Sequence, residues 1–113
     1  MRDARLNPAG IKKYPSSTPI AILTNDWTAS SGEATLLCFR GLETVKTFGT
    51  PTAGYASANV VQELADGYQL LITTSCDVAR TGECFCDDPI EPDVPTDTPL
   101  EEALDWIRSG NVL

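Results

Sequence analysis

The chain has 113 residues, a length that suits one domain with a core of its own. Its formal net charge is −8, from 16 acidic and 8 basic residues, and its lysines and arginines form no stripe, so we expect no binding to nucleic acid. Hydrophobic residues make up 42% of the chain and are spread along it, which indicates a folded domain. No stretch approaches the roughly 20 consecutive apolar residues of a membrane span.

The first half of the chain predicts a strand, a helix and a second strand. Residues 1–18 are polar and are expected to be a lead-in that continues an upstream part. Residues 19–24 form a short apolar run bounded by turn formers, which is typical of a buried strand. Apolar residues recur at helical spacing over 30–42, and residues 44–48 form the second strand. This order favours a parallel crossover.

The second half predicts a loop, a β-hairpin and a helix. Residues 49–58 are small and carry Pro51 and Gly54, which mark a loop. Two β-like runs, 59–64 and 68–74, flank Ala65, Asp66 and Gly67, a strong hairpin signal.

The remaining residues are expected to be irregular over 75–97, where prolines recur, and helical over 98–108. Thr98 and Glu101 fit a capping box at the start of that helix. Gly110 follows its end.

The four cysteines predict neither a metal site nor a cofactor. They lack paired Cys-x-x-Cys spacing, and the chain has no histidine to complete a mixed zinc site. Cys38 lies in an apolar stretch and is expected to be a buried, inert thiol. Cys76, Cys84 and Cys86 lie in one region that can form a disulfide, but the sequence does not choose a pairing.

The turn between the first strand and the helix is the candidate site. It reads Thr-Ala-Ser-Ser-Gly-Glu over residues 28–33. A strand that ends in a small-residue turn and continues as a helix brings the turn hydroxyl beside unpaired helix amides, as in the mounting of a serine nucleophile. Ser30 and Glu33 also fit an ordinary capping box, and the chain has no histidine to act as base.

Four stretches in order resemble the tail-specific (C-terminal processing) serine peptidase family. They are the strand and turn over 19–33, the Gly-Thr-Pro-Thr-Ala-Gly run over 49–54, the hairpin around Asp66, and the Pro-Ile-Glu-Pro-Asp-Val run over 89–94. The turn and the loop are most similar to the nisin-resistance branch, whose members cleave a peptide antibiotic. The resemblance implies an α/β, ClpP/crotonase-like core fragment, with residues 19–113 as the C-terminal part of a peptidase catalytic domain.

The resemblance assigns roles to individual residues. It implies that Ser30 is the nucleophile, with Ser31 as the runner-up position, and that the amide of Ser31 is one oxyanion donor. Many family members carry a lysine base after the glycine of the Pro-Thr-x-Gly loop, where this chain has Tyr55. The nisin-resistance branch instead uses a histidine from an upstream part of the domain, so the base is expected from outside these residues.

The expected substrate is a peptide or protein, bound near Trp27, Gly54 and Tyr55. Trp27 directly precedes the turn, where it either lines a peptide pocket or packs in the core. The competing function is a non-catalytic peptide-binding or assembly module that keeps the fold. A chain without the upstream strands would expose an unpaired edge or apolar face, so we expect self-association, most simply as a homodimer.

Overall fold

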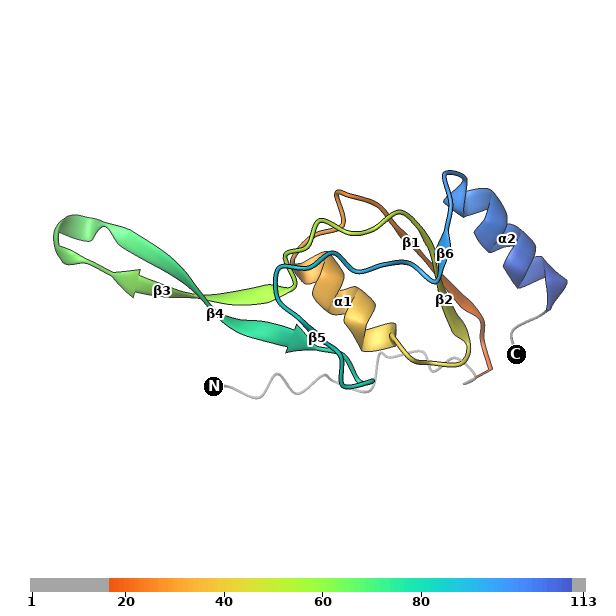
Figure 1. Cartoon of the computed structure of the whole chain (residues 1–113), viewed down its shortest axis with the longest axis horizontal. Coiled ribbons are helices and arrows are strands. Elements are labelled where there is room, and N and C mark those ends of the chain that lie inside the picture. Colours follow the sequence, from red (N-terminus) through yellow and green to blue (C-terminus); the bar gives the residue numbers. More distant parts are fainter. Residues whose placement is uncertain (1–16, 111–113) are drawn as a thin grey trace, which may run out of the picture.

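The computed structural model describes residues 17–110, so almost all of the lead-in expected over 1–18 lies outside the described residues. A three-stranded parallel sheet with a crossover helix, a projecting hairpin joined by one short strand, and a terminal helix make up the described part (Figure 1). The elements are β1 (Ile20–Thr24), α1 (Ser31–Phe39), β2 (Val45–Gly49), β3 (Ser57–Glu63), the 3₁₀ turn η2 (Ala65–Gly67), β4 (Gln69–Val78), β5 (Cys84–Phe85), β6 (Val94–Pro95) and α2 (Pro99–Ser109).

The first sheet has the order β1-β2-β6, and both of its pairings are parallel. The register runs from Ile20 opposite Val45 to Thr24 opposite Gly49, with α1 as the crossover, so the predicted strand-helix-strand unit is confirmed. The expectation that residues 75–97 are irregular was wrong, since they contain the end of β4 and all of β5 and β6. Strands of two residues carry no periodicity, and Pro95 is tolerated because β6 is an edge strand.

The predicted hairpin is confirmed and is longer than the sequence pattern suggests. β3 and β4 pair antiparallel from Ser57 opposite Cys76 to Glu63 opposite Gln69. The turn between them places Asp66 at φ 69°, a left-handed conformation that suits aspartate in a turn. The ribbon extends away from the rest of the chain, and the C-terminal end of β4, next to the body of the molecule, pairs with β5 (Figure 1).

Both helices end where glycine permits a left-handed backbone. α1 ends at Phe39, shorter than the predicted 30–42, and Gly41 follows at φ 81°. α2 ends at Ser109 with Gly110 as the left-handed C-cap. The predicted capping box of α2 was wrong: Thr98 makes no side-chain cap hydrogen bond.

A different polar contact stabilises the start of α2. The Thr96 hydroxyl donates to Glu102 Oε1 at 2.5 Å, and its oxygen accepts from the amide of Thr98 at 3.1 Å. The helix packs on the first sheet, with the rings of Trp106 and Phe48 5.7 Å apart. No helix among residues 17–110 is long and apolar enough to cross a membrane.

The core is small and lies beside α1. Its buried members are Leu36, Leu37, Ala56, Ala79 and Ile90, with Ile22 and Phe85 packed against them. Cys38 is exposed, which corrects the expectation of a buried thiol: its Sγ donates to the carbonyl of Ala34 at 3.3 Å on the helix surface. The helix has a short buried face, and residue 38 falls outside it.

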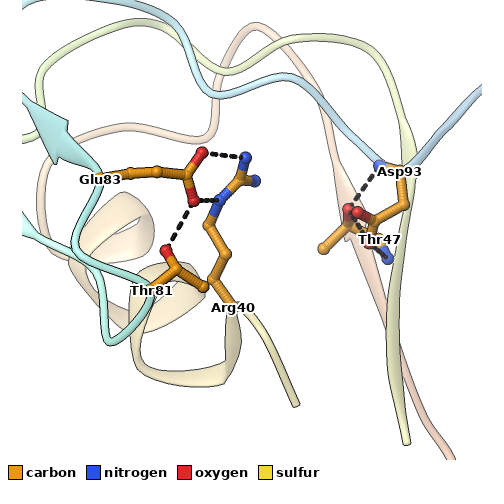
Figure 2. Close-up of polar contacts among 5 residues, drawn as sticks. All are labelled: Arg40, Thr47, Thr81, Glu83 and Asp93. Atoms are coloured by element: carbon orange, nitrogen blue, oxygen red, sulfur yellow. Dashed lines mark hydrogen bonds and ion pairs between the residues drawn. The ribbon is translucent and has the colours of Figure 1, made fainter. Parts of the chain in front are cut away.

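Two polar links join distant segments around this core (Figure 2). The amide and hydroxyl of Thr47 both donate to Asp93 Oδ2, at 2.9 and 2.8 Å, and the amide of Asp93 donates back to the hydroxyl. Arg40, just after α1, forms a two-pronged ion pair with Glu83, at 2.7 and 2.9 Å. This contact and the Thr81 hydroxyl lower the pKa of Glu83 to about 2.

The hairpin exposes apolar side chains on both faces. Opposed residues Val61 and Leu71 are 51% and 63% exposed, and Val60 and Ile72 on the other face are 52% and 43% exposed. A two-stranded ribbon is marginally stable in water by itself. These side chains therefore favour contact with a further surface.

We predict that replacing both Val61 and Leu71 with threonine reduces self-association of the chain. The loss of two exposed apolar side chains removes contact area, while threonine keeps a high strand preference. Analytical ultracentrifugation measures the dissociation constant, which should rise at least about tenfold, equivalent to 1.4 kcal/mol. Leu100→Thr on α2, where leucine is 59% exposed, is the control and should leave association unchanged. Equal association of all three proteins would contradict the prediction.

Candidate active site

The segment between β1 and α1 is a compact turn held by its own side chains. The amide of Thr28 donates to the carbonyl of Asn25 at 2.9 Å, and the hydroxyl of Thr28 accepts from the amide of Asn25 at 3.1 Å. The amide of Trp27 donates to Asn25 Oδ1 at 3.0 Å. Asparagine and threonine make such local bonds readily, so the sequence itself directs the chain sharply from strand to helix.

Ser30 occupies the end of this turn in an unusual backbone conformation. It is the N-cap of α1, it is exposed, and its φ and ψ are 50° and −112°. A positive φ in a residue with a side chain costs on the order of 1–3 kcal/mol and persists only where surrounding contacts hold it. Ser31 begins the helix, so its amide has no acceptor within the helix. A hydroxyl and helix amides therefore lie together at an exposed corner.

Glu33 supplies the contacts that hold this corner. Its side chain is completely buried, yet it belongs to the first turn of α1. Both carboxylate oxygens accept hydrogen bonds: Oε2 from the amides of Ser30 and Tyr55, each at 2.8 Å, and Oε1 from the hydroxyl of Thr52 at 2.5 Å and the amide of Gly54 at 2.8 Å. One carboxylate thus binds the serine turn to the 52–55 loop.

These contacts decide the charge of Glu33. Burial by itself raises the pKa of the carboxyl, because a charge is disfavoured away from water. The Thr52 hydroxyl and the amides of Gly54, Tyr55 and Ser30 together outweigh burial and lower the pKa below its ordinary value. Glu33 is therefore ionised at neutral pH and acts as an anchor with its lone pairs already occupied.

The 52–55 loop has a second anchor on the opposite side. The hydroxyl of Thr52 accepts from the amide of Ile90 at 2.8 Å, and the amide of Thr52 donates to the carbonyl of Ile90 at 3.2 Å. The amide of Ala53 donates to the carbonyl of Thr28 at 2.9 Å. The loop is therefore fixed between the serine turn and the Pro-Ile-Glu-Pro segment.

Gly54 is required by this packing. Its φ is 85°, and a Cβ on it would lie 3.0 Å from the nitrogen of Pro89 and 3.1 Å from the carbonyl oxygen of Asp87. Both neighbours are backbone atoms, so they cannot move aside cheaply. Gly54 is buried and its amide donates to Glu33, so it positions the loop from inside.

The other residues expected near the substrate lie on the surface around Ser30. Trp27 is 87% exposed, so the alternative that it packs in the core was wrong for the described chain. Tyr55 is 61% exposed, and its own amide donates to Glu33. Two exposed aromatic side chains therefore come from the segments that the carboxylate joins.

A cavity lies beside α1, away from Ser30. That cavity has a volume of about 400 Å³ and is lined by Ala34, Leu37, Cys38, Asp77, Val78 and Arg80. Ser30 is not among the lining residues. Among residues 17–110, no group of histidine, cysteine or acidic side chains able to hold a metal includes Glu33.

The anchoring roles of Glu33 and Thr52 were missed by the sequence analysis. The Ser-x-x-Glu spacing identified Glu33 only as a local cap, and the observed bond from the Ser30 amide is that local part. The three other donors lie 19 to 22 residues away. The small-residue run over 49–54 was the available signal that a loop approaches something closely.

Comparison with known proteins identifies relatives that share this site region. Residues 2–96 match the sequence pattern of peptidase family S41. The nisin-resistance protein of Lactococcus lactis subsp. lactis is 44% identical over 97 residues, which are 86% of this chain and 30% of that protein. The chain therefore spans less than a third of this relative's length.

Solved structures agree with this match. A lipoprotein from Streptococcus agalactiae is 47% identical and superimposes with a TM-score of 0.73, over 80% of this chain and 32% of that protein. Mature CPAF is 19% identical and superimposes with a TM-score of 0.60, over 85% of this chain and 19% of that one, which shows a shared fold.

We predict that Glu33→Gln lowers the free energy of unfolding at pH 7 by about 3 kcal/mol, because an amide group donates where the carboxylate accepts and leaves buried donors unpaired. The pKa of Glu33 is lowered on folding, so its stabilisation is present above the unfolded value of about 4.3 and is lost as the pH falls through the folded value. Urea unfolding should show that the free energy of unfolding falls more from pH 7 to pH 3 in the wild type than in the variant. An equal decrease in both proteins would contradict the anchoring role.

We also predict that Ser30→Gly is more stable than Ser30→Ala by about 1 kcal/mol, because glycine accepts a positive φ and alanine does not. Both variants lack the hydroxyl, so the difference isolates the backbone. Chemical denaturation of the two proteins side by side measures it. Ser31→Gly against Ser31→Ala is the control, and there glycine should be the less stable member because residue 31 is helical. A Ser30→Gly protein less stable than Ser30→Ala would refute the strain.

Proposed function

The chain belongs to peptidase family S41, and from this membership we propose that it is the nucleophile-bearing part of a serine endopeptidase. In this proposal residues 19–113 are the C-terminal part of a catalytic domain with a ClpP/crotonase-like α/β core. Ser30 attacks the carbonyl carbon of a peptide bond. Ser31 is the runner-up position for the nucleophile.

The observation that carries the proposal is the backbone of Ser30. Ser30 has a positive φ at the junction of a strand and a helix, and it is exposed at the helix N-terminus. A merely structural N-cap has no need of this conformation, since N-caps ordinarily adopt extended backbone angles. The strain is retained by a buried carboxylate with four donors, which supports a role for the corner beyond capping.

The proposed chemistry follows from the position of Ser30. As its Oγ bonds to the peptide carbonyl, the hydroxyl proton leaves to a base and negative charge develops on the carbonyl oxygen. The amide of Ser31 is one donor to that oxygen, and the N-terminal end of α1 favours the charge. Glu33 is a positioning residue, because its oxygens are occupied by the backbone and by Thr52.

The proposed base comes from outside these 113 residues. The chain contains no histidine, and Tyr55 stands where many family members carry a lysine. An upstream histidine, as the resemblance to the nisin-resistance branch implies, would abstract the proton from Ser30. The exposed rings of Trp27 and Tyr55 are proposed to contact the peptide on either side of the serine. By its relative's name, nisin is the first peptide to test.

A non-catalytic peptide-binding or assembly module remains the second candidate. The absence of histidine from these residues and the tyrosine at position 55 favour it where no base reaches Ser30 from elsewhere, because a serine without a base is a poor nucleophile. It requires only that the exposed aromatic residues and the hairpin bind a partner. The two candidates differ in what happens when a base is supplied.

We therefore predict the behaviour of a chimera in which the matching 97 residues of this chain replace their counterparts in the Lactococcus lactis nisin-resistance protein. In this proposal the rest of that protein supplies the base and further donors, so we expect mass spectrometry to detect hydrolysis of nisin. Ser30→Ala in the chimera should lower turnover by at least about a thousandfold, the order expected for loss of a nucleophile. The isolated chain should show no turnover.

Ser31→Ala is the matched control, because it alters the neighbouring hydroxyl and keeps the amide. It should leave most of the activity. A folded chimera that binds nisin without cleaving it would favour the module, and activity that survives Ser30→Ala would refute the assignment of Ser30.

A further inference from the structure

Three of the four cysteines meet where the hairpin joins the rest of the chain. β4 pairs with β5 so that Val78 lies opposite Cys84 and Asp77 opposite Phe85. Continuing this antiparallel register brings Cys76 opposite Cys86, and alternation along β5 sends Cys84 and Cys86 to the same side. The three sulfur atoms accordingly lie within 4.8 Å of one another.

The three sulfurs are in two chemical states. Cys76 and Cys86 form a disulfide, with Cα atoms 4.4 Å apart. Cys84 is a free and exposed thiol beside that bond. A thiolate next to a disulfide is a nucleophile beside its electrophile, and this pair needs no reagent from solution to react. Cys38, the other free thiol, lies on α1 outside this group.

We propose that Cys84 and the Cys76–Cys86 disulfide form an intramolecular thiol–disulfide exchange site. The Cys84 thiolate attacks Sγ of Cys76, a Cys76–Cys84 bond forms, the Cys76–Cys86 bond breaks, and Cys86 leaves as a thiolate. The number of disulfides and thiols is unchanged, so the step needs neither oxidant nor reductant. The reverse attack by Cys86 restores the starting state.

The residues next to Cys84 are held in place, whereas Cys86 leads into a segment that the exchange would release. Glu83, the residue before Cys84, is held by Arg40 and by the hydroxyl of Thr81 (Figure 2). Cys86 instead leads into Asp87 and Pro89, whose backbone atoms lie against Gly54. Moving the bridge from Cys86 to Cys84 therefore removes a covalent tie from the segment that packs against the 52–55 loop.

The observed bond favours exchange over metal binding by the same trio. A thiolate metal site requires all three sulfurs to be reduced, whereas two of them are joined to each other here. Exchange uses the state that the structure contains. It also explains why the third cysteine stands in the register position next to the bond.

The test maps the free thiols of the whole 113-residue chain over time at pH 8. Samples are quenched with acid, capped with N-ethylmaleimide and digested with chymotrypsin, which can cut after Phe85 and so separate Cys84 from Cys86. We expect the free thiol to be shared between Cys84 and Cys86, so that both carry label and their two labels sum to one per chain, with Cys38 fully labelled. Label that stays only on Cys84 and Cys38 would overturn the proposal.

Variants separate exchange from scrambling in an unfolded chain. Cys84→Ser should keep the Cys76–Cys86 bond and show label at Cys38 alone, while Cys38→Ser should leave the exchange of the other three unchanged. Cys86→Ser should form a Cys76–Cys84 bond with glutathione disulfide as the oxidant. Bridges to Cys38 in the wild type, or a Cys86→Ser protein whose two remaining hairpin thiols stay free, would refute a built exchange site.

Discussion

The carboxylate of Glu33 is the contact on which the organisation of this chain depends. It is fully buried, and it accepts hydrogen bonds from the serine turn and from the loop after β2 at once. A buried charge is tolerable only when its lone pairs are satisfied, so the two segments cannot separate without a large loss. The strained backbone of Ser30 persists because this loss exceeds the strain.

The rest of the described chain extends this junction. Thr52 passes the connection on to Ile90 in the core, and Gly54 allows Pro89 to approach. The disulfide lies just before that segment, so the hairpin, the core and the serine turn are joined through a few consecutive residues. By contrast, the hairpin itself leaves apolar side chains in water, which agrees with a chain that spans about 30% of its relative.

The sequence predicted an element correctly where residues within that one segment determine its backbone conformation. The apolar run of β1, the turn residues of the hairpin and the glycine after α2 each specify their own backbone, and these elements formed as predicted. The expectations for Cys38, for the cap at Thr98 and for residues 75–97 were wrong. The first and the last depend on which face a short element turns to distant neighbours, and periodicity over so few residues does not report it. The cap failed because the hydroxyl of Thr96 makes the polar contacts at the start of α2 instead.

The sequence by itself determined the strand-helix-strand order, the hairpin, the terminal helix and the family, because those depend on local preferences and on motifs in a fixed order. Only the tertiary structure decided that Glu33 is an anchor, that Trp27 is exposed and that Cys76 pairs with Cys86. These facts arise from groups brought together across many residues of chain. Burial and hydrogen bonding between such groups are fixed by packing, and no spacing along the chain encodes them directly.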